Sequence, residues 1–312
     1  MTEFNFDVLV IGSGPAGNTA SIYLVRNGLK VAMISGMSIG GQLTTTTEVE
    51  NFPGFPEPIL GIDLMQKMMD QARNLGVEIV YDQVDSVNFS QKPFRCTTSS
   101  GDVYIADKVV ISTGAGAKWL GLPSEAKFMG RGVSACATCD GSFYKNMDVA
   151  VVGGGLSAGT EALHLSHICN KVYLIHRRNN FKMVDSLFRK VRDTKNIEFV
   201  MESEVIEILG TEEPKAVSAV KVRNTKTLEE KEIPVKCVFM AIGRAPATEI
   251  FKNTGLHMDE HGYIITMPDS SRTNISGVYA VGDVANKPFK QAVIASGYGA
   301  IASMEVQQDM EK

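Results

Sequence analysis

The sequence predicts an α/β protein made of two similar folds, and two internally related segments carry that prediction. Residues 7–12 form a short apolar run that leads into a glycine-rich turn at 12–17 and then into a helix-compatible stretch. Residues 149–158 repeat this order, again with closely spaced glycines, about one domain length later. Glycines at this spacing let a backbone turn approach a pyrophosphate at the N-terminus of a helix. We therefore predict two Rossmann-like dinucleotide-binding domains.

The first unit follows the order strand, tight turn, helix, strand. Its opening run, Asp7-Val-Leu-Val-Ile-Gly12, has the composition of a parallel strand that is buried on both faces. A helix is expected from Asn18 to Asn27, and a second strand at 30–34. Ser35 then stands where an acidic residue would hold the ribose of a dinucleotide. This departure leaves the identity of the bound dinucleotide open.

The remainder of the first half predicts a functional loop and further core elements. Residues 40–54 are polar, rich in glycine and hydroxyl groups, and without helical or strand period, which is typical of a functional loop. Residues 60–75 form an expected amphipathic helix, whose methionine stripe we interpret as core packing. Strands are expected at 78–81, 84–89, 94–98 and 108–114.

Short segments with glycine or proline divide the chain. Residues 114–117, followed by Gly121-Leu-Pro123, and residues 242–246 have the composition of linkers. Beyond the second glycine turn, strands are expected at 171–175, 198–200, 219–223, 235–240 and 273–283, and a last helix from about 288 to 308. We therefore predict that one dinucleotide domain comprises 1–116 and 245–312, and that a second one, 117–244, is inserted into it.

The residues Cys136-Ala-Thr-Cys139-Asp140 indicate redox chemistry. Two cysteines separated by two residues can close a small disulfide, and the thiolate, whose pKa such motifs lower, is the attacking species. The adjacent acid can move protons. The alternative is half of a structural zinc site, which needs four ligands and usually a second pair of this kind. No second C-x-x-C occurs in the sequence, so a redox dithiol is favoured and no metal is expected.

A basic cluster follows the second glycine turn, at the position where an acid would select NADH. His176, Arg177 and Arg178 come directly after the expected strand at 171–175, with Lys182 one turn later. Guanidinium groups fit a 2′-phosphate through paired hydrogen bonds, so the cluster favours NADPH over NADH. The alternative is a solvated run of charges.

Composition excludes several classes of function. The 312 residues carry a net charge of −4, with no basic stripe to neutralise the phosphates of a nucleic acid. No apolar run approaches the ~18–20 residues of a membrane span, and no signal peptide is visible. The low number of cysteines fits a reducing cytoplasm. We interpret Cys96, Cys169 and Cys237 as small buried hydrophobic residues.

Taken together, the chain resembles low-molecular-weight, bacterial-type thioredoxin reductases over nearly its whole length. The resemblance rests on the first glycine turn and on several strings, of which A-C-A-T-C-D is the most specific. These strings are G-G-Q-L-T-T-T-T-E-V-E-N at 40–51, L-G-L-P-S-E at 120–125, G-R-G-V-S-A-C-A-T-C-D-G at 130–141, H-R-R at 176–178, G-V-Y-A-V-G-D at 277–283 and K-Q-A at 290–292. The resemblance implies FAD in the first domain, NADPH in the inserted one, thioredoxin as partner, and a homodimer.

The resemblance and the two glycine turns together assign the cofactor contacts. The expected FAD contacts are Gly12, Ser13, Gly14, Pro15, Ala16, Gly17, Ser35, Gly41, Gln42, Asn51, Val84, Asp283, Lys290, Gln291 and Ala292. The expected NADPH contacts are Gly153, Gly155, Ser157, Ala158, His176, Arg177, Arg178 and Lys182.

The resemblance also assigns roles around the cysteine pair. The second cysteine of the family, here Cys139, faces the flavin, and the first, here Cys136, attacks the protein substrate. Asp140 would act as acid and base for the departing thiolate. Arg131 and Phe143 would contact thioredoxin. The dithiol and the NADPH turn share the inserted domain while both must meet one flavin, so we expect that domain to rotate on its two linkers.

Two positions depart from the family pattern. Lys182 stands where arginine is usual, which keeps the charge and loses the two-pronged hydrogen bonding. Ser142 stands where the family often carries an aromatic residue beside the partner. Other hypotheses are a ferredoxin-type NADPH reductase, which generally lacks the dithiol, a small-molecule disulfide oxidase, and a flavin-bound redox sensor without turnover. Asp140, Arg177 and Arg178 speak against lost catalysis.

Overall fold

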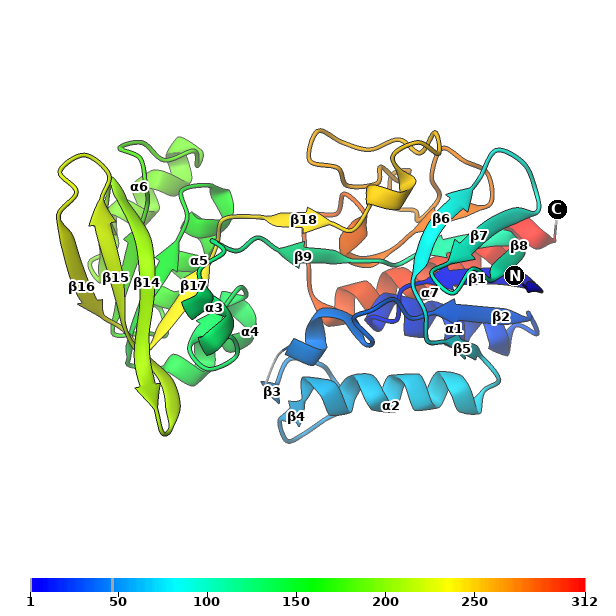
Figure 1. The fold of residues 1–312 in the computed structure, drawn as a ribbon, viewed down its shortest axis with the longest axis horizontal. Coiled ribbons are helices and arrows are strands. Elements are labelled where there is room, and N and C mark those ends of the chain that lie inside the picture. The colour runs from blue at the N-terminus through cyan, green and yellow to red at the C-terminus, as the bar shows by residue number, and fades with distance from the viewer. Residues whose placement is uncertain (1, 46–47, 312) are drawn as a thin grey trace. The chain divides into compact units, whose positions relative to one another are not determined.

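The structure, a computed structural model, describes residues 2–45 and 48–311. The chain divides into two compact units (Figure 1). Unit 1 contains the residues up to Gly116 and those from Ala245 onward, and unit 2 contains Ala117–Arg244. Unit 2 is therefore inserted into unit 1, and the chain passes between them twice. Within the described ranges, no helix is long and apolar enough to cross a membrane.

Unit 1 is built on a mainly parallel sheet with an antiparallel extension. Its strand order is β5-β2-β1-β8-β7-β6, and β19 also pairs with β8. The strands are β1 Glu3–Ile11, β2 Val31–Ile34, β5 Glu78–Val80, β6 Val84–Asn88, β7 Phe94–Thr98, β8 Val103–Ile111 and β19 Val278–Ala280. Ile11 lies opposite both Ile34 and Ile111, so the first glycine turn starts at the carboxyl edge of parallel strands. Open α/β sheets bind their ligands at this edge.

Burial on both faces explains why β1 is apolar without interruption. Leu9 and Ile11 belong to the core on one side of the sheet, and Val8 and Val10 belong to the core on the other side. Successive side chains of a strand point to opposite faces, so a strand covered on both sides needs apolar residues at every position. The sequence-based interpretation of this strand is confirmed.

The α-helices of unit 1 pack tightly near the glycine turn. They are α1 Pro15–Arg26, α2 Gly61–Asn74 and α7 Ala292–Met310. The first helix begins at Pro15 rather than at Asn18, because a proline at the first helical position has a suitable φ and needs no N–H partner there. Gly299 of α7 approaches α1 so closely that an added Cβ would lie 2.3 Å from the backbone oxygen of Ala16. This approach positions α7 on α1.

The other elements of unit 1 are short. They are η1 Gly41–Thr45, β3 Glu48–Val49, β4 Ile59–Leu60, η3 Glu249–Phe251 and η4 Gly282–Val284. The predicted functional loop at 40–54 thus contains a 3-10 turn and one strand of the β3–β4 ribbon, while its residues 46 and 47 lie outside the described residues. The strand expected at 273–283 is limited to β19, because the chain turns at Gly277, whose φ is +93°.

Unit 2 contains a second parallel sheet, with the order β10-β17-β11-β12-β13. The strands are β10 Val133–Ser134, β11 Asp148–Val152, β12 Lys171–Ile175, β13 Ile197–Val200 and β17 Cys237–Met240. The helices are α3 Pro123–Phe128, α4 Ala137–Asp140, η2 Gly141–Tyr144, α5 Leu156–Ser166 and α6 Asp185–Asp193. The segment from β11 through α5 to β12 repeats the strand, turn, helix, strand order of unit 1. The predicted fold class, with one Rossmann-like domain inserted into another, is confirmed.

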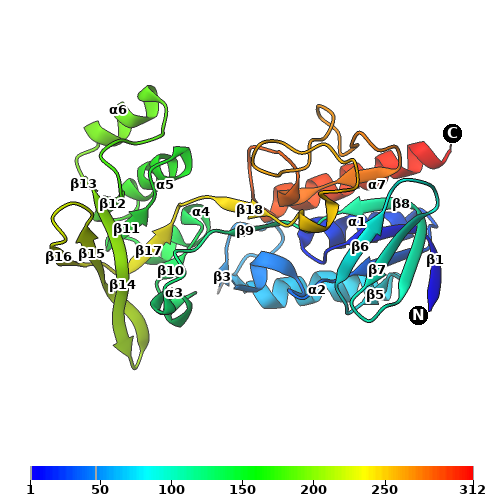
Figure 2. The same cartoon turned by 45° about the horizontal axis from the view of Figure 1, so that its top comes forward.

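An antiparallel layer beside this sheet was only partly predicted (Figure 2). It consists of β14 Ser203–Glu212, β15 Lys215–Asn224 and β16 Glu230–Pro234. The sequence indicated only residues 219–223, within β15. The other two strands expose charged residues, such as Glu207 in β14 and Glu232 in β16, which weakens the apolar signal.

The expected linkers are more regular than their composition suggests. Ala115–Ala117 (β9) and Arg244–Pro246 (β18) are paired strands of a two-stranded sheet. Pro123, which was expected in a linker, is the first residue of α3. Extended, hydrogen-bonded backbone therefore forms both chain passages.

Candidate active site

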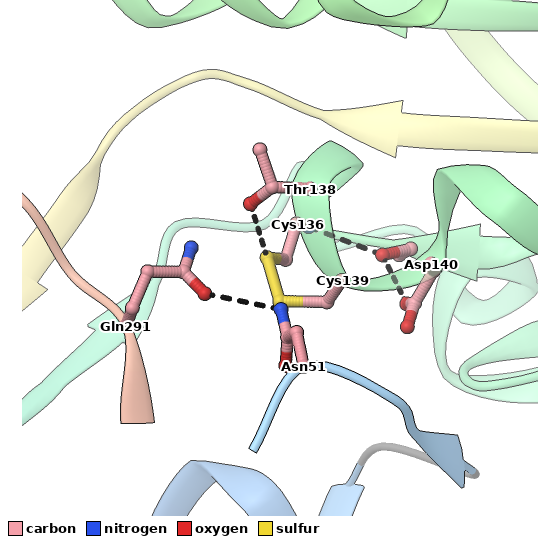
Figure 3. The surroundings of a disulfide bond; sticks show 7 residues. Asn51, Cys136, Thr138, Cys139, Asp140 and Gln291 are labelled. Atoms are coloured by element: carbon pink, nitrogen blue, oxygen red, sulfur yellow. Dashed lines mark hydrogen bonds between the residues drawn. A yellow bond between two sulfur atoms is a disulfide. The ribbon is translucent and has the colours of Figure 1, made fainter. Parts of the chain in front are cut away.

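The two cysteines of the C-x-x-C sequence form a disulfide in unit 2 (Figure 3). Their Cα atoms lie 5.3 Å apart on a tight turn that leads into α4. The backbone N–H groups of Cys139 and Asp140 both donate hydrogen bonds to the carbonyl oxygen of Cys136, at 3.2 and 3.1 Å. The hydroxyl of Thr138 lies 3.5 Å from the sulfur of Cys136, which carries no hydrogen in the disulfide. The turn itself therefore holds the two sulfurs in bonding distance.

Ser134 ties the acidic residue of this turn to the first cysteine. Its hydroxyl donates a hydrogen bond of 2.6 Å to the carboxylate of Asp140 and accepts one of 3.1 Å from the backbone N–H of Cys136. Ser134 is buried at the end of β10. Sequence reasoning missed Ser134, although it lies two residues before Cys136 within the G-V-S-A-C string.

The environment of Asp140 favours its protonated form. Burial raises the pKa of this carboxyl above its ordinary value, and the hydrogen bond from Ser134 partly offsets the rise. Its Oδ1 is buried and has no hydrogen-bond partner within the described residues. Because an unpaired carboxylate oxygen out of water is costly, the site holds a proton more readily than a surface aspartate does. This property suits a proton donor beside sulfur.

A half-buried tyrosine and a buried thiol lie close to Asp140. The Tyr144 hydroxyl donates a hydrogen bond to the sulfur of Cys237, and its ring packs edge-on against Phe239 at 6.1 Å. Burial raises the pKa of both Tyr144 and Cys237, and the nearby Asp140 charge raises them further. Both groups are therefore neutral, and Cys237 is the buried, inert thiol that the sequence indicated. Cys96 and Cys169 are also free and buried.

A second carboxyl group contacts the cysteine turn from α5. The backbone N–H of Ala137, between the two cysteines, forms a hydrogen bond with the carboxyl of Glu161. Burial raises the pKa of Glu161 to about 7, while Arg244 and the Ala137 N–H act in the opposite direction. Sequence reasoning missed Glu161, because no local motif connects a residue of α5 with a turn that precedes β11.

The alternative of a zinc site finds no ligand set in the part of the chain that the structure describes. No group of three or more histidine, cysteine, aspartate or glutamate side chains is placed there to hold a metal ion. Cys136 and Cys139 bond to each other instead.

The second glycine turn, between β11 and α5, has the geometry of a nucleotide cradle. An added Cβ at Gly153 would lie 2.4 Å from the backbone oxygen of Ala241, so only glycine fits against β17 there. An added Cβ at Gly155 would meet nothing within 4 Å, so the chain is open at the N-cap of α5. Ala158 is buried and Ser157 is exposed in the first turn of this helix. The turn thus offers helix N–H groups to a pyrophosphate.

The basic cluster separates into a packed histidine and exposed cations. His176 lies over the glycine turn, where a Cβ on Gly154 would be 2.1 Å from its ring, and its ring stacks on Phe181 at 5.1 Å. Burial lowers the pKa of His176. Arg177 and Arg178 are exposed, and neither guanidinium pairs with an acid of residues 2–45 or 48–311. These unpaired cations at the end of β12 are suited to an anionic ligand.

Lys182 is fixed to the same turn by its backbone. Its N–H donates a 2.7 Å hydrogen bond to the carbonyl oxygen of Gly154, and its side chain is exposed. The structure therefore brings the predicted NADPH contacts of unit 2 together at one end of its sheet.

The first glycine turn, in unit 1, is built in the same way. An added Cβ at Gly12, whose φ is +112°, would lie 2.4 Å from the carbonyl oxygen of Ser112, and one at Gly17 would lie 2.0 Å from that of Gly12. Gly14 is open and is the N-cap of α1. Ser13 is buried, donates to the carbonyl of Ser35 at 3.0 Å and accepts from the N–H of Gly40 at 2.9 Å. The turn can receive a pyrophosphate, and Ser35 adds no competing negative charge.

The remaining predicted FAD contacts of unit 1 divide into polar and buried groups. The side-chain amide of Asn51 donates to Gln291, the N-cap residue of α7, at 3.4 Å (Figure 3). The ammonium group of Lys290 donates to the carbonyl of Asp283 at 3.0 Å. Val84, by contrast, lies with its side chain in the core at the start of β6, so only its backbone can contact a cofactor. The other predicted contacts of this set are Pro15 and Ala16 in α1, Gly41 and Gln42 in η1, and Ala292 at the start of α7.

The two predicted partner contacts lie in unit 2. Arg131 is exposed in the turn before β10, where its N–H donates to the carbonyl of Phe128 at 2.8 Å. Phe143 is half-buried in η2, next to the exposed Ser142.

Known proteins share this architecture and these sequence features. The family model described as pyridine nucleotide-disulphide oxidoreductase matches residues 6–299. A thioredoxin reductase of Rickettsia conorii is 48% identical over 98% of both chains. Crystal structures of thioredoxin reductases from Streptococcus pyogenes and Lactococcus lactis are each 37% identical and cover 98% of this chain and 98% and 99% of their own. Their TM-scores are 0.92 and 0.66, and the Lactococcus structure is described as the FR conformation.

The chain belongs to the pyridine nucleotide-disulphide oxidoreductase family and, within it, to the thioredoxin reductases. The family resemblance that the sequence indicated is thereby confirmed.

We predict that Ser134→Ala raises the pKa of Asp140 further. The Ser134 hydroxyl stabilises the ionised carboxylate, so its loss favours the protonated form, and the carboxyl should stay protonated to a higher pH. Infrared titration of the protonated carboxyl band, with Asp140→Asn to identify the signal, measures this pKa directly.

Ser99→Ala provides the matched control. The Ser99 hydroxyl also donates to a carboxylate, that of Asp85, but at an exposed position of unit 1. It should leave the titration of Asp140 unchanged. A Ser134→Ala titration that coincides with that of the wild type would contradict the proposed link.

Proposed function

We propose that this protein is an NADPH-dependent flavoenzyme that reduces the disulfide of thioredoxin through FAD and the Cys136–Cys139 pair. One observation carries the proposal: a disulfide lies next to a half-buried carboxyl group of raised pKa, on a domain that also contains a dinucleotide turn. Membership of the thioredoxin reductases supports the choice of substrate.

The glycine turn of unit 1 would hold FAD, and that of unit 2 would hold NADPH. Bound FAD supplies an acceptor for the hydride of NADPH and a donor of the electron pair to the disulfide. In unit 1 the open N-terminus of α1, together with Ser13 and Ser35, would receive the pyrophosphate side of the cofactor. Asn51 and Gln291, which are hydrogen-bonded to each other, would orient it through their amides.

The cysteine pair would deliver the electrons by thiol–disulfide exchange. A thiolate on Cys136 attacks one sulfur of the thioredoxin disulfide, forms a mixed disulfide and releases a thioredoxin thiolate, which takes a proton from Asp140. Cys139 then gives its proton to the Asp140 carboxylate and attacks the sulfur of Cys136, which restores the disulfide of the enzyme and releases the second thioredoxin thiolate, and this thiolate takes up a proton from Asp140 or water. Arg131 and Phe143 would contact the partner during this exchange.

The arginines after β12 would select NADPH over NADH. Arg177 and Arg178 are exposed cations of unit 2, and a guanidinium group can donate paired hydrogen bonds to the 2′-phosphate. Lys182 adds a third charge that can make only single hydrogen bonds. His176 would position this segment on the glycine turn rather than bind phosphate, because burial keeps its ring neutral.

We predict that Arg177→Ala combined with Arg178→Ala raises the KM for NADPH and leaves that for NADH nearly unchanged. Each charge-assisted contact contributes on the order of 1.5–3 kcal/mol, so roughly ten- to a hundredfold in affinity is expected per contact. Steady-state kinetics with both cofactors measure the change.

The control is Arg189→Ala with Lys190→Ala, which removes the same charge from exposed positions of α6 in the same unit. It should leave the preference for NADPH intact. Equal losses for NADPH and NADH in the Arg177 and Arg178 variant would refute the assignment.

Serine variants of the two cysteines should differ in what they trap. Cys139→Ser leaves Cys136 able to attack oxidised thioredoxin, but nothing resolves the product, so a stable mixed disulfide should accumulate. Cys136→Ser should trap far less, and both variants should lose NADPH-dependent thioredoxin reduction. Non-reducing electrophoresis detects the adduct, and turnover retained by either variant would remove the pair from the pathway.

We further propose that unit 2 rotates between half-reactions. The dithiol and the NADPH turn both belong to unit 2, whereas the FAD turn belongs to unit 1, and the chain passes between the units only at β9 and β18. Two relatives of equal identity to this chain match it with TM-scores of 0.92 and 0.66, so members of this family differ in overall arrangement. This difference supports motion between two arrangements.

An engineered cross-link between the units should separate the half-reactions. A lock that holds Cys139 at the flavin should permit electron exchange between flavin and dithiol and block reduction by NADPH. The opposite lock should permit reduction of the flavin by NADPH and stop delivery to thioredoxin. Rapid-mixing absorbance of the flavin follows both steps, and full turnover by a verified lock would exclude the two-position mechanism.

We also propose a homodimer that acts in the cytoplasm. The family resemblance supports the dimer, and three cysteines that remain free and buried suit a reducing compartment.

A further inference from the structure

Glu161 contacts the turn that contains Cys136 and Cys139. The contact is with the backbone between the two cysteines and not with a sulfur atom. The residue lies in the second turn of α5, and its carboxyl is hydrogen-bonded to the N–H of Ala137. Ala137 is 1% exposed and stands between Cys136 and Thr138 at the start of α4. Any charge on this carboxyl is therefore held against the backbone that connects the two cysteines.

The surroundings of Glu161 leave this charge poorly compensated. Its Oε2 is buried and has no hydrogen-bond partner within the described residues. Arg244, at the end of unit 2, is the cation that acts on it. Two other titratable groups lie on the neighbouring elements. Asp140 on α4 accepts a hydrogen bond from the Ser134 hydroxyl, and His164 on α5 has an electrostatic interaction with His167. With burial raising the pKa of Glu161 to about 7, the group changes charge within the physiological range.

We propose that Glu161 is a positioning residue that sets the reduction potential of the Cys136–Cys139 couple through the negative charge that it holds against the backbone of Ala137. The inference rests on the proposed function only in taking this pair as the redox couple. Nothing in it depends on how thioredoxin or NADPH binds.

The direction of the effect follows from the charge balance of the reaction. Reduction breaks the bond between the two sulfurs, takes up two electrons and one proton, and leaves one thiol and one thiolate. A negative Glu161 opposes the new thiolate and so favours the disulfide, which lowers the potential and makes the dithiol a stronger reductant. A neutral Glu161 has no such effect. The influence should therefore be present above about pH 7 and fade below it.

Glu161→Gln separates charge from structure, because glutamine keeps an oxygen acceptor for the Ala137 N–H and cannot ionise. The holoenzyme is equilibrated with mixtures of reduced and oxidised dithiothreitol, quenched, and analysed for alkylated Cys136 and Cys139 by mass spectrometry. At about pH 8.5 the variant should be reduced at a ratio of reduced to oxidised dithiothreitol on the order of tenfold lower than the wild type, which corresponds to about 30 mV. At about pH 5.5 the two midpoints should coincide.

Glu207→Gln removes the same charge from an exposed position of β14 and should match the wild type at both pH values. A shift of equal size at both pH values would mean that the substitution acts through structure, and it would overturn the proposal. So would the absence of any shift. If the proposal fails in either of these ways while the wild type still reduces thioredoxin with NADPH, the proposed function stands. If the pH-dependent shift is found but the wild type does not reduce thioredoxin, only the proposed function is refuted.

The wild-type protein provides a second measurement that needs no variant. A thiolate on the turn that Glu161 contacts raises the pKa of this carboxyl, so reduction should take up additional protons between about pH 7 and 8. The midpoint potential should therefore fall more steeply with pH in this range than on either side of it. A uniform slope through this range would overturn the proposal even if Glu161→Gln did not fold.

Discussion

Partial removal of water from two half-buried carboxyl groups is the constraint on which the chemistry of unit 2 depends. Asp140 and Glu161 reach the same turn from different elements, and burial raises the pKa of both. In a low-dielectric interior the charged form of an acid is disfavoured unless hydrogen bonds or cations compensate. Here one serine hydroxyl, one backbone N–H and one arginine provide partial compensation. The turn with the disulfide is therefore in contact with two groups that retain protons longer than surface acids do.

The same interior explains why other sulfur in unit 2 takes no part in redox chemistry. Cys169 and Cys237 are buried, and burial raises the pKa of both thiols. A thiol that cannot ionise is a poor nucleophile, so it does not compete with the pair at 136 and 139. Selectivity among five cysteines thus follows from burial, since the redox pair is partly exposed and the others are not.

The sequence predicted those features that depend on residues close together in the chain. The order of strand, glycine turn and helix predicted both Rossmann-like domains, because parallel strands buried on both faces leave uninterrupted apolar runs such as that of β1. The C-x-x-C spacing predicted the disulfide, since four residues suffice to close it. The short strands β9 and β18 were missed because glycine and proline in them resemble linker composition.

Contacts between distant segments could not be predicted in this way. Glu161 approaches Ala137 only because α5 packs on α4, and the residues between them form β11 and its turn. Val84 was assigned to a cofactor by family resemblance, yet its side chain faces the core, because its place in β6 is set by packing within unit 1. The position of His176 over Gly154 likewise depends on how β12 ends beside the turn. Such contacts between distant segments exist only once the sheets have formed.

The insertion of unit 2 into unit 1 has a consequence for biosynthesis. Strand β19 and helix α7 lie near the end of the chain, and they complete unit 1 by pairing with β8 and packing on α1. Unit 2 is contiguous and leaves the ribosome before either of them. Since domains generally fold as units during synthesis, the segment with Cys136 and Cys139 can reach its folded state while the α1–α7 contact of unit 1 does not yet exist. Until unit 1 is complete, the oxidation state of the newly made cysteine pair is therefore set by the thiols and disulfides that surround it.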